Sequence, residues 1–338
     1  MREPAGVIDV AERAGVSIGT VSNVLNHPER VAPATRDRVL RAIAELGFVR
    51  NEAARQLRAG RGRTVGLVVL DVGNPFFTDL AAGVEKTADQ YGLSVVLCNS
   101  GDDAEREEHH LSLLEEQRAF GVLITPVARR TPAVDVIRRR GTPVVLVDHG
   151  SSARQCSVSV NDQVGGEFAM AHLIAQGHKR IAFVGGPLPI KQVSERLAGA
   201  RLALRAAGMR PGALTVMETR ALNVAAGRQT GDLIADLPAR SRPTAVFCAN
   251  DLLALGVLQT MTRRGLLVPG DLAIVGYDDI DFASAAAVPL TSVRQPSAQL
   301  GQAAMELLVD EAHAAQSHQH RQVVFEPELV VRESTVLG

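Results

Sequence analysis

The sequence predicts a small all-α head, built as a helix-turn-helix, followed by an α/β body of two lobes, each with a doubly wound parallel sheet. Three observations lead to this fold class. Residues 6–46 carry helical patterns and no strand-like run. From residue 64 onward, short β-branched runs alternate with amphipathic stretches of helix length, as in parallel sheets covered on both faces. These units are too many for one ordinary doubly wound sheet, so we expect two.

Length and composition set the broad class of protein. A chain of 338 residues has room for two or three domains. With 46% hydrophobic and 22% charged residues, it is typical of a soluble globular protein. No apolar run reaches the roughly eighteen residues of a membrane span, and the N-terminus lacks the apolar segment of a secretory signal. We therefore expect a cytoplasmic protein without a membrane partner.

The cysteines and the charges refine this class. The three cysteines are far apart and form no C-x-x-C pair, so we expect no metal site and no cofactor. The net charge of −1 hides an asymmetry, because residues 1–63 carry eleven Arg against seven acids, or +4, and the remainder therefore carries −5. A basic head on an acidic body indicates a polyanionic partner for the head.

Three helices are predicted in the head. The first covers Asp9–Ala14 and ends at Gly15, which suits the positive φ that closes a helix. Ser17 is a good N-cap for the second helix, over about residues 18–25. The third begins at Ala32-Pro33. The outward positions of the second helix are short and mostly polar, as entry into a DNA major groove requires; they are Ile18, Gly19, Ser22, Asn23 and Asn26.

A polar, Arg-rich linker over residues 48–63 joins the head to the body. It can form one short helix, which is marginal alone in water and carries arginines that repel one another. We expect it to fold only when phosphates neutralise those charges and a second copy packs beside it.

Strand-helix units follow in the body. The strand-like runs are Thr64–Leu70, Leu93–Cys98, Gly121–Thr125, Pro143–Val147, Arg180–Val184, Thr244–Cys248 and Leu272–Val275. The helical stretches include Phe77–Tyr91, Ala104–Arg118, Val164–Gln176, Ser194–Ala207 and Asp251–Arg264.

Polar side chains follow several of these strands, at the edge where α/β folds place ligands. They are Asn74, Asp148, Arg196, Asn250 and Asp278. Phe76 and Phe77, either core residues or a stacking surface for a sugar ring, lie beside the first of them. This set favours a polyhydroxylated neutral ligand. No nucleophile-base set and no known catalytic or phosphate-binding motif accompanies the carboxylates, so we expect no enzyme.

The head and linker resemble the lactose-repressor (LacI/GalR) family over nearly all of residues 5–60, through DVAERAGVS, TVSNVLN and ATRDRVLRAIAELGF. The resemblance implies that Ile18, Gly19 and Asn23 read bases. It implies phosphate contacts for Ser17, Thr20, Ser22 and Asn26, with Arg30 as a further contact. It also implies a hinge helix carrying Arg55 and Leu57, with Leu57 wedged into the minor groove. Gly19 leaves a base-reading position without a side chain, and Arg50 stands where a proline is usual.

The body is similar to the type I periplasmic sugar-binding fold of that family, through NPFF, GHKRIAFVGGP, PTAVFCANDLLALG and IVGYDDI. The resemblance implies ligand contacts from Asn74, Phe76, Asp148, Arg196, Asn250, Asp278 and Gln295. Ile190 stands where purine-binding members carry an arginine, and Leu222 where an aromatic residue is frequent. Both departures argue against a purine.

The resemblance implies a domain plan and a function. The plan is a DNA-binding domain over residues 1–47, a hinge over 48–63 and a ligand-binding and dimerisation domain over 64–338. Its N-lobe covers about 64–160 and 292–322, and its C-lobe about 161–291 and 323–338. The function is that of a homodimeric repressor on a near-palindromic operator in double-stranded DNA, controlling sugar uptake or catabolism genes and released by a monosaccharide or derivative.

Three other functions stay open at this point. The regulator could be gated by a protein or by a non-sugar metabolite such as a nucleoside. A free periplasmic binding protein is disfavoured by the helical head and the missing signal.

Overall fold

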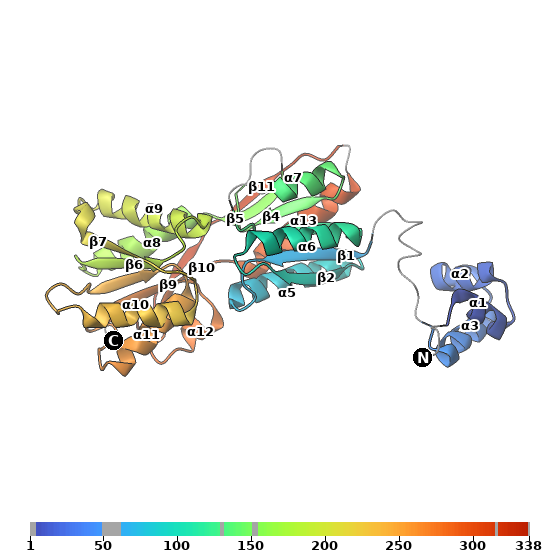
Figure 1. Cartoon of the computed structure of the whole chain (residues 1–338), viewed down its shortest axis with the longest axis horizontal. Helices are drawn as coiled ribbons and strands as arrows, with labels where there is room; N and C mark the ends of the chain where they lie inside the picture. The colour runs from blue at the N-terminus through green and yellow to red at the C-terminus, as the bar shows by residue number, and fades with distance from the viewer. Residues whose placement is uncertain (1–4, 49–61, 129–131, 151–154, 315–316, 337–338) are drawn as a thin grey trace. The chain divides into compact units, whose positions relative to one another are not determined.

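A computed structural model describes residues 5–48, 62–128, 132–150, 155–314 and 317–336. The chain divides into two compact units, Met1–Gly62 and Arg63–Gly338. We describe these units, the head and the body, separately (Figure 1).

The described part of the head contains helices α1 (Val7–Ala14), α2 (Ile18–Asn26) and α3 (Pro33–Leu46), with a 3₁₀ turn, η1 (Pro28–Arg30), after α2. Gly15 has φ 61° and ends α1, as expected of a residue without a Cβ. Apolar side chains from all three helices form one small core; its buried members are Val10, Ala11, Ala14, Val21, Val24, Val39 and Ala42. The predicted helix-turn-helix is therefore present, with the polar side of α2 turned outward.

The described body holds two six-stranded sheets, one in each lobe. The N-lobe sheet is parallel throughout, in the order β11-β5-β4-β3-β1-β2. The C-lobe sheet has the order β12-β10-β9-β8-β6-β7 and one antiparallel strand, β12, at its edge. The N-lobe strands are β1 (Thr64–Val69), β2 (Ser94–Asn99), β3 (Gly121–Ile124), β4 (Val144–Val147), β5 (Ser157–Val160) and β11 (Gln322–Phe325). The C-lobe strands are β6 (Ile181–Gly185), β7 (Leu214–Glu218), β8 (Ala245–Cys248), β9 (Ala273–Asp278), β10 (Thr291–Arg294) and β12 (Glu328–Val330). The predicted fold class is confirmed.

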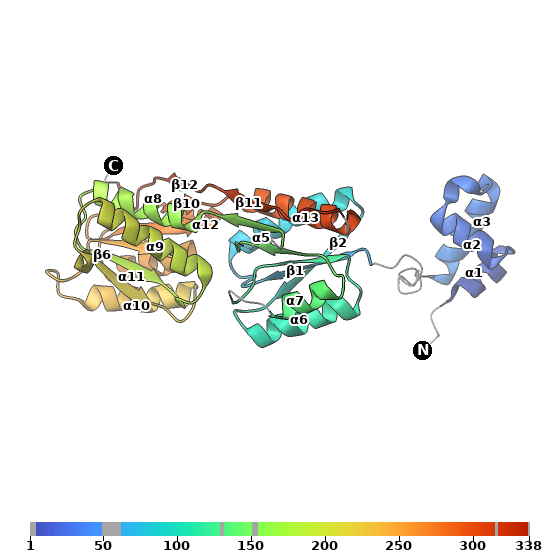
Figure 2. The ribbon, with the colours of Figure 1, turned by 90° about the horizontal axis from the view of Figure 1, so that it is seen from above.

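Helices cover both faces of each sheet, as Figure 2 shows. In the N-lobe, α5 (Pro75–Gln90) packs beside α13 (Ser297–His313), and α6 (Ala104–Glu116) beside α7 (Pro132–Arg139). In the C-lobe, α8 (Asp162–Ala175) packs beside α9 (Lys191–Ala206), and α10 (Val224–Asp236) beside α11 (Asp251–Arg263). A short helix, α12 (Asp281–Ser284), and a 3₁₀ turn, η2 (Pro211–Ala213), complete the C-lobe elements. Central strands β3, β4, β8 and β9 are wholly buried, as a sheet covered on both faces requires.

Glycines bring α8 and α9 into very close contact. A Cβ at Gly199 would lie 1.9 Å from the carbonyl oxygen of Gln163, and one at Gly166 would lie 2.1 Å from that of Arg196. Any other residue at these positions would force the two helices apart. The contact therefore fixes the backbone of Arg196 against α8.

The chain crosses between the lobes after β5, after β10 and after β11. Since β10 pairs with β9 and β12, Thr291–Arg294 belongs to the C-lobe sheet, and the second crossing follows Arg294, beyond the boundary expected at residue 292. Since β11 pairs with β5, the N-lobe extends to Phe325, past the boundary expected at residue 322. Strand pairing decides these boundaries, and it is not visible in local composition.

Candidate functional sites

The outer side of α2 is the candidate DNA-binding surface. Ser17 caps the helix, since its Oγ accepts a 3.1 Å hydrogen bond from the backbone N–H of Thr20. Asn26 folds back along the helix and donates to the carbonyl oxygen of Ser22 at 2.8 Å. Ile18 is 49% exposed and lies outside the apolar core of the head. Short polar side chains around one exposed apolar residue suit base edges and thymine methyl groups.

The predicted DNA contacts gather on this surface. Thr20 and Ser22 are half-buried, and Arg30 lies on η1, next to α2. The exposed members are Ser17, Ile18, Gly19, Asn23, Asn26 and Arg30. Arg55 and Leu57, predicted on the hinge, lie outside the described residues.

A cavity of about 270 Å³ lies between the two lobes of the body. This volume is at the lower end of small-molecule sites, which fits one or two small rings. All of the predicted ligand contacts line it, namely Asn74, Phe76, Phe77, Asp148, Arg196, Asn250, Asp278 and Gln295. A larger, open depression on the C-lobe, of about 640 Å³, is lined mostly by apolar surface and holds none of them.

Arg196 forms the base of the cavity. Its Nε donates to Asp162 Oδ1 at 2.8 Å, and its Nη1 donates to the carbonyl oxygen of Ala249 at 2.6 Å. The guanidinium carbon lies 3.6 Å from the centroid of the Tyr277 ring, a cation-π contact. Asp278 Oδ1 lies 3.7 Å from Nη1. With only 4% of the residue exposed, Arg196 is held in one orientation by groups on several elements.

Asp148 follows β4 and is almost fully buried. Gln192 Nε2 donates to Asp148 Oδ2 at 2.9 Å and to the carbonyl oxygen of Asp148 at 2.6 Å. Burial, and next the negative charge of Asp162, raise the pKa of Asp148 to about 7. Gln192 is a lining residue that the sequence reasoning did not name, although it lies one helical turn before Arg196 and therefore on the same face of α9.

Asp278 is the last residue of β9 and accepts hydrogen bonds from Asn74 and Gln295. Asn74 Nδ2 donates to its Oδ2 at 3.0 Å, and Gln295 Nε2 donates to its Oδ1 at 2.7 Å. Burial raises the pKa of Asp278, and the charge of Arg196 offsets part of this rise. Behind it, the buried Asp251 accepts from the backbone N–H of Ile280 at 3.0 Å and so fixes the turn after β9.

Backbone strain is concentrated at this cavity. Asp102, Asp148 and Asp278 line it with φ values of 58°, 52° and 103°. A left-handed conformation at a residue with a Cβ costs about 1–3 kcal/mol and persists where the surroundings require it. The strain therefore marks the strand ends around the cavity as the place where side-chain direction matters.

The lining carries excess negative charge. Its acids are Asp71, Asp102, Asp148 and Asp278, and Arg196 is the one basic residue among the described lining residues. Burial and the charge of Asp71 raise the pKa of Asp102. The described lining contains no Ser, Thr, Cys, His or Lys, so these residues offer no nucleophile-base pair.

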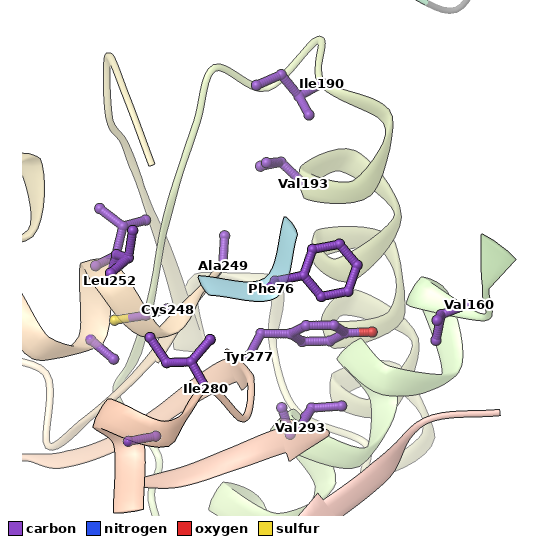
Figure 3. Packing of buried hydrophobic residues seen from close by; sticks show 14 of the residues in the cluster. Phe76, Val160, Ile190, Val193, Cys248, Ala249, Leu252, Tyr277, Ile280 and Val293 are labelled. Carbon is purple, nitrogen blue, oxygen red and sulfur yellow. The ribbon is translucent and has the colours of Figure 1, made fainter. Parts of the chain in front are cut away.

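The walls of the cavity are apolar. Phe76 and Phe77 meet edge to face, with ring centroids 5.1 Å apart, and both also belong to the hydrophobic core. Figure 3 shows Phe76 of the N-lobe among the C-lobe side chains Ile190 and Tyr277. A flat ring can pack against this surface while its polar atoms meet the carboxylates.

Asn250 was expected to contact the ligand, but its side-chain amide forms hydrogen bonds within the protein. Its Oδ1 accepts from the backbone N–H of Leu253 at 3.0 Å and caps α11, while its Nδ2 donates to the carbonyl oxygen of Leu222 at 2.9 Å. Both ends of the amide are therefore occupied. Asn250 lines the cavity chiefly by positioning the Leu222 loop.

Two family models match the head and part of the body. Residues 7–51 match the family described as bacterial regulatory proteins, lacI family, and residues 170–335 match a periplasmic binding protein-like domain. The HTH-type transcriptional repressor PurR of Vibrio campbellii is 34% identical over 334 residues, covering 98% of each chain. PurR of Aliivibrio fischeri (strain MJ11) is 33% identical over 334 residues, again 98% of each chain.

Solved structures of transcriptional regulators are also similar to this chain. The lac repressor dimer bound to operator and the anti-inducer ONPF has a TM-score of 0.84 and 28% identity, covering 99% of this chain and 100% of that one. The regulator CelR in complex with cellobiose has a TM-score of 0.69 and 35% identity, covering 98% and 99%.

A helix-turn-helix head joined to a two-lobed body with an interlobe cavity defines a ligand-responsive, DNA-binding regulator. The chain belongs to the lacI family of bacterial regulatory proteins and is a DNA-binding transcriptional repressor. Operator DNA and a small-molecule effector are the partners of such repressors. The relatives are regulators and not enzymes, which confirms the prediction of a non-enzymatic protein. Among the described residues, no helix combines the length and apolarity needed to cross a bilayer.

Proposed function

We propose that the interlobe cavity binds a small, uncharged effector rich in hydrogen-bond donors. We also propose that binding of this effector controls the affinity of the head for operator DNA. One observation carries this proposal. Asp148 Oδ1 and Gln295 Oε1 are buried oxygen acceptors of the cavity lining that have no hydrogen-bond partner among the described residues. Buried acceptors are normally satisfied, so a ligand with N–H or O–H groups suits them.

The charge of the cavity lining further limits the chemical class of ligand that can bind. Four carboxyl groups, of which Asp148 with its pKa of about 7 is only partly ionised at neutral pH, face one guanidinium, which is itself paired with the buried Asp162. A phosphate or carboxylate on the ligand would meet net repulsion in a poorly hydrated space, where charges interact strongly. Sugar phosphates, nucleotides and uronates are therefore disfavoured, whereas free sugars, nucleobases and nucleosides are accommodated.

A nucleobase or nucleoside is the first candidate within this class. The relatives that match over 98% of the chain are named PurR, which favours a purine-type compound over the sugar preferred from sequence. Phe76 offers an aromatic wall, and the free acceptors can take ring or exocyclic N–H groups.

A neutral sugar is the second candidate, because specific observations favour it. Ile190 lines the cavity where purine-binding members carry an arginine. Relatives of solved structure include CelR with cellobiose and a regulator from Enterococcus faecium with bound ribose, at 35% and 28% identity.

Thermal-shift and calorimetric titrations of the purified full chain separate these candidates. The panel contains adenine, adenosine and inosine, then ribose and cellobiose, each tested beside a phosphorylated counterpart. We expect a purine or nucleoside to raise the melting temperature by mass action and the phosphorylated compounds to leave it unchanged. Stabilisation by sugars alone would select the second candidate, and stabilisation by the phosphorylated compounds alone would contradict the proposed charge selection.

A pair of glutamine variants links any effector to the cavity. Gln295→Met keeps the side-chain volume and removes the free acceptor, and should weaken effector binding about 10-fold or more, since an unpaired buried group costs ~1–3 kcal/mol. Gln302→Met is the matched control, because Gln302 is exposed on α13 and its side chain donates to Glu306. Equal effector affinity in the two variants would remove Gln295 from the site.

Transmission to DNA completes the proposal. Two chains pair through their bodies in the cytoplasm and present two heads to a near-palindromic operator. Exposed apolar residues support pairing, with Val96 and Leu97 on β2 at 42% and 41% exposure and Phe282 on α12 at 58%. The effector changes the angle between the lobes, and the hinge over residues 48–63, with Arg55 and Leu57, folds or unfolds in response.

Operator binding in the presence and absence of effector tests the direction of the response. We expect the effector to release the operator, and Leu57→Ala to weaken both operator affinity and DNA bending in a salt-dependent complex. Tighter operator binding with effector would show corepression instead. Unchanged bending by Leu57→Ala would contradict the minor-groove wedge.

A further inference from the structure

Four metal-ligating side chains converge at the edge of the N-lobe sheet where β5 and β11 begin. They are Cys156, Glu311, His318 and His320, and one ligand atom from each lies within 4.8 Å of all the others. We propose that they form a tetrahedral site for Zn²⁺. This site differs from the expectation of no metal site, because Cys156 and His318 lie 162 positions apart in the sequence and no C-x-x-C pair marks them.

The sheet register brings the ligands together. Strand β5 begins one residue after Cys156, and its Ser157 pairs with Gln322 of β11. The backbone N–H of Arg321 lies 3.4 Å from Cys156 Sγ. His318 and His320 come just before Arg321 in the chain, ahead of the start of β11, and are therefore close to the same sulfur. Glu311 comes from the last turn of α13. The site therefore joins three segments of one lobe.

The separations suit a small cation. Cys156 Sγ lies 3.0 Å from His318 Nε2 and 3.7 Å from His320 Nδ1, and His320 Nδ1 lies 4.0 Å from Glu311 Oε2. With metal–ligand bonds of about 2.0–2.3 Å, a tetrahedral zinc ion requires ligand atoms about 3.3–3.8 Å apart. Side-chain adjustments of under about 1 Å would close the coordination sphere. Thiolate with imidazole is a donor set that zinc prefers.

A carboxylate lies beside the imidazole of His318, on the side away from the cysteine. The side chain of His318 is 3% exposed, and its Nδ1 lies 3.2 Å from Asp310 Oδ2. That carboxylate leaves Nε2 directed at the cysteine sulfur, the carboxylate–histidine arrangement found around metal sites. The Arg321 N–H on the sulfur is a further supporting contact.

The surrounding charges permit a dication. Arg138 Nη2 lies 3.4 Å from His320 Nε2, and Arg321 Nη2 lies 3.0 Å from Asp310 Oδ2, so two guanidinium groups adjoin the site. Against them stand the carboxylates of Glu311 and Asp310, joined by the thiolate that forms when Cys156 gives its proton to solvent as the metal binds. The sum of these five charges is −1, which Zn²⁺ reverses to +1 without any buried anion left unpaired.

Such an ion would connect the end of α13, the segment at 318–320 and the start of β5. Since the chain passes between the lobes at the far ends of β5 and β11, the metal would stabilise the N-lobe strands from which two of the crossings leave. We expect binding to raise the melting temperature of the full chain, because the ion is bound only when these segments are folded together.

Cobalt substitution tests the site with a direct spectroscopic signature. The full chain is stripped with a chelator and titrated with Co²⁺ under reducing conditions. We expect one Co²⁺ per chain, strong visible bands typical of tetrahedral cobalt and a near-ultraviolet thiolate-to-cobalt band, all removed by one equivalent of Zn²⁺. Uptake below one equivalent, or weak octahedral bands without the thiolate band, would overturn the proposal.

Variants assign the bands to residues. Cys156→Ser should lose the thiolate band, whereas Cys98→Ser, which changes another buried cysteine of the same lobe, should keep it. His320→Ala, at a more exposed position, guards against misfolding of the cysteine variant and should retain the band at reduced affinity. Asp310→Asn should weaken metal affinity about 10–100-fold, as second-shell changes do. A thiolate band that survives in Cys156→Ser would contradict the assignment.

Discussion

Asn74 and Asp278 form a direct hydrogen bond between the two lobes, with Asn74 Nδ2 donating to Asp278 Oδ2 over 3.0 Å in a buried setting. The same amide caps α5, since Asn74 Oδ1 accepts from the backbone N–H of Phe76 at 3.1 Å. One residue therefore both begins an N-lobe helix and contacts the C-lobe. Both partners of this bond line the interlobe cavity, so under the proposed function we expect ligand binding to be coupled to the angle between the lobes.

A pair of substitutions separates these two roles of Asn74. In Asn74→Ser the hydroxyl can still cap α5, but it is too short to reach Asp278. We expect the ligand-free body to sample a wider lobe angle, seen as a larger radius of gyration by small-angle scattering. Asn74→Ala loses the cap as well, and its free energy of unfolding should be about 1 kcal/mol lower than that of Asn74→Ser. Scattering by Asn74→Ser identical to wild type would contradict the bridging role.

Arg196 should be required for both stability and ligand binding. Arg196→Ala leaves the buried Asp162 and Asp278 without their cation, and should lower the free energy of unfolding by about 3–5 kcal/mol in urea titrations. Arg196→Lys keeps the positive charge, but it loses the planar guanidinium with its several N–H donors and its cation-π contact with Tyr277. This variant should bind effector at least about 10-fold more weakly. Arg263→Ala is the control, because its pair with Asp232 is exposed and is worth about 0–1 kcal/mol. Equal losses in Arg196→Ala and Arg263→Ala would refute the buried network.

Stability should fall with rising pH because of Asp148. Its pKa is raised from 3.8 to about 7 in the folded protein. Between these values the folded state holds a proton that the unfolded chain has lost, so stability falls as the pH rises from 3.8 to about 7 and levels off above the folded pKa. The advantage of Asp148→Asn over wild type should grow by about 2 kcal/mol from pH 5.5 to pH 8, at ~1.4 kcal/mol per pH unit below the folded pKa. Urea unfolding at both pH values measures it, and a constant difference would exclude the shifted pKa.

Operator reading should depend on the exposed side of α2. Asn23→Ala removes an exposed amide that can pair with a base edge, and should cost about 1–3 kcal/mol of operator affinity while relaxing specificity at one position. Arg41→Ala on α3 changes an exposed arginine outside that surface and should weaken binding by little. Fluorescence anisotropy on operator and scrambled DNA gives both values. A uniform loss on all sequences in Asn23→Ala would indicate a phosphate contact instead.

The elements that could be predicted from the sequence are those whose conformation follows from their own residue types and hydrophobic pattern. Strands β1, β3, β4 and β8 are continuous apolar runs, and they lie within one or two residues of the expected limits. Gly15 and Ser17 mark the turn between α1 and α2 by their backbone preference alone. The lining residues at the ends of parallel strands could be named because the fold class itself places ligands there.

Elements that depend on distant partners were not predicted. Helix α10 holds Gly227 and Gly231, which weaken a helix in isolation, yet a Cβ at Gly227 would lie 2.3 Å from the carbonyl oxygen of Leu253 on α11. Strand β7 is an edge strand that is only half-buried and shows no clear apolar run. The roles of Gln192 and Asp162 arise only when α8 and α9 meet, and the cluster around Cys156 arises only when β11 pairs with β5.

The glycine contact between α8 and α9 has a consequence for which parts of the cavity can change. Gly166 and Gly199 bring the two helices so close that Arg196 and Asp162 are held in one arrangement. Ile190 and Leu222 stand instead at the start of α9 and in the loop before α10. We therefore expect substitutions at these two wall positions to change which effector is bound while the Arg196 network stays in place.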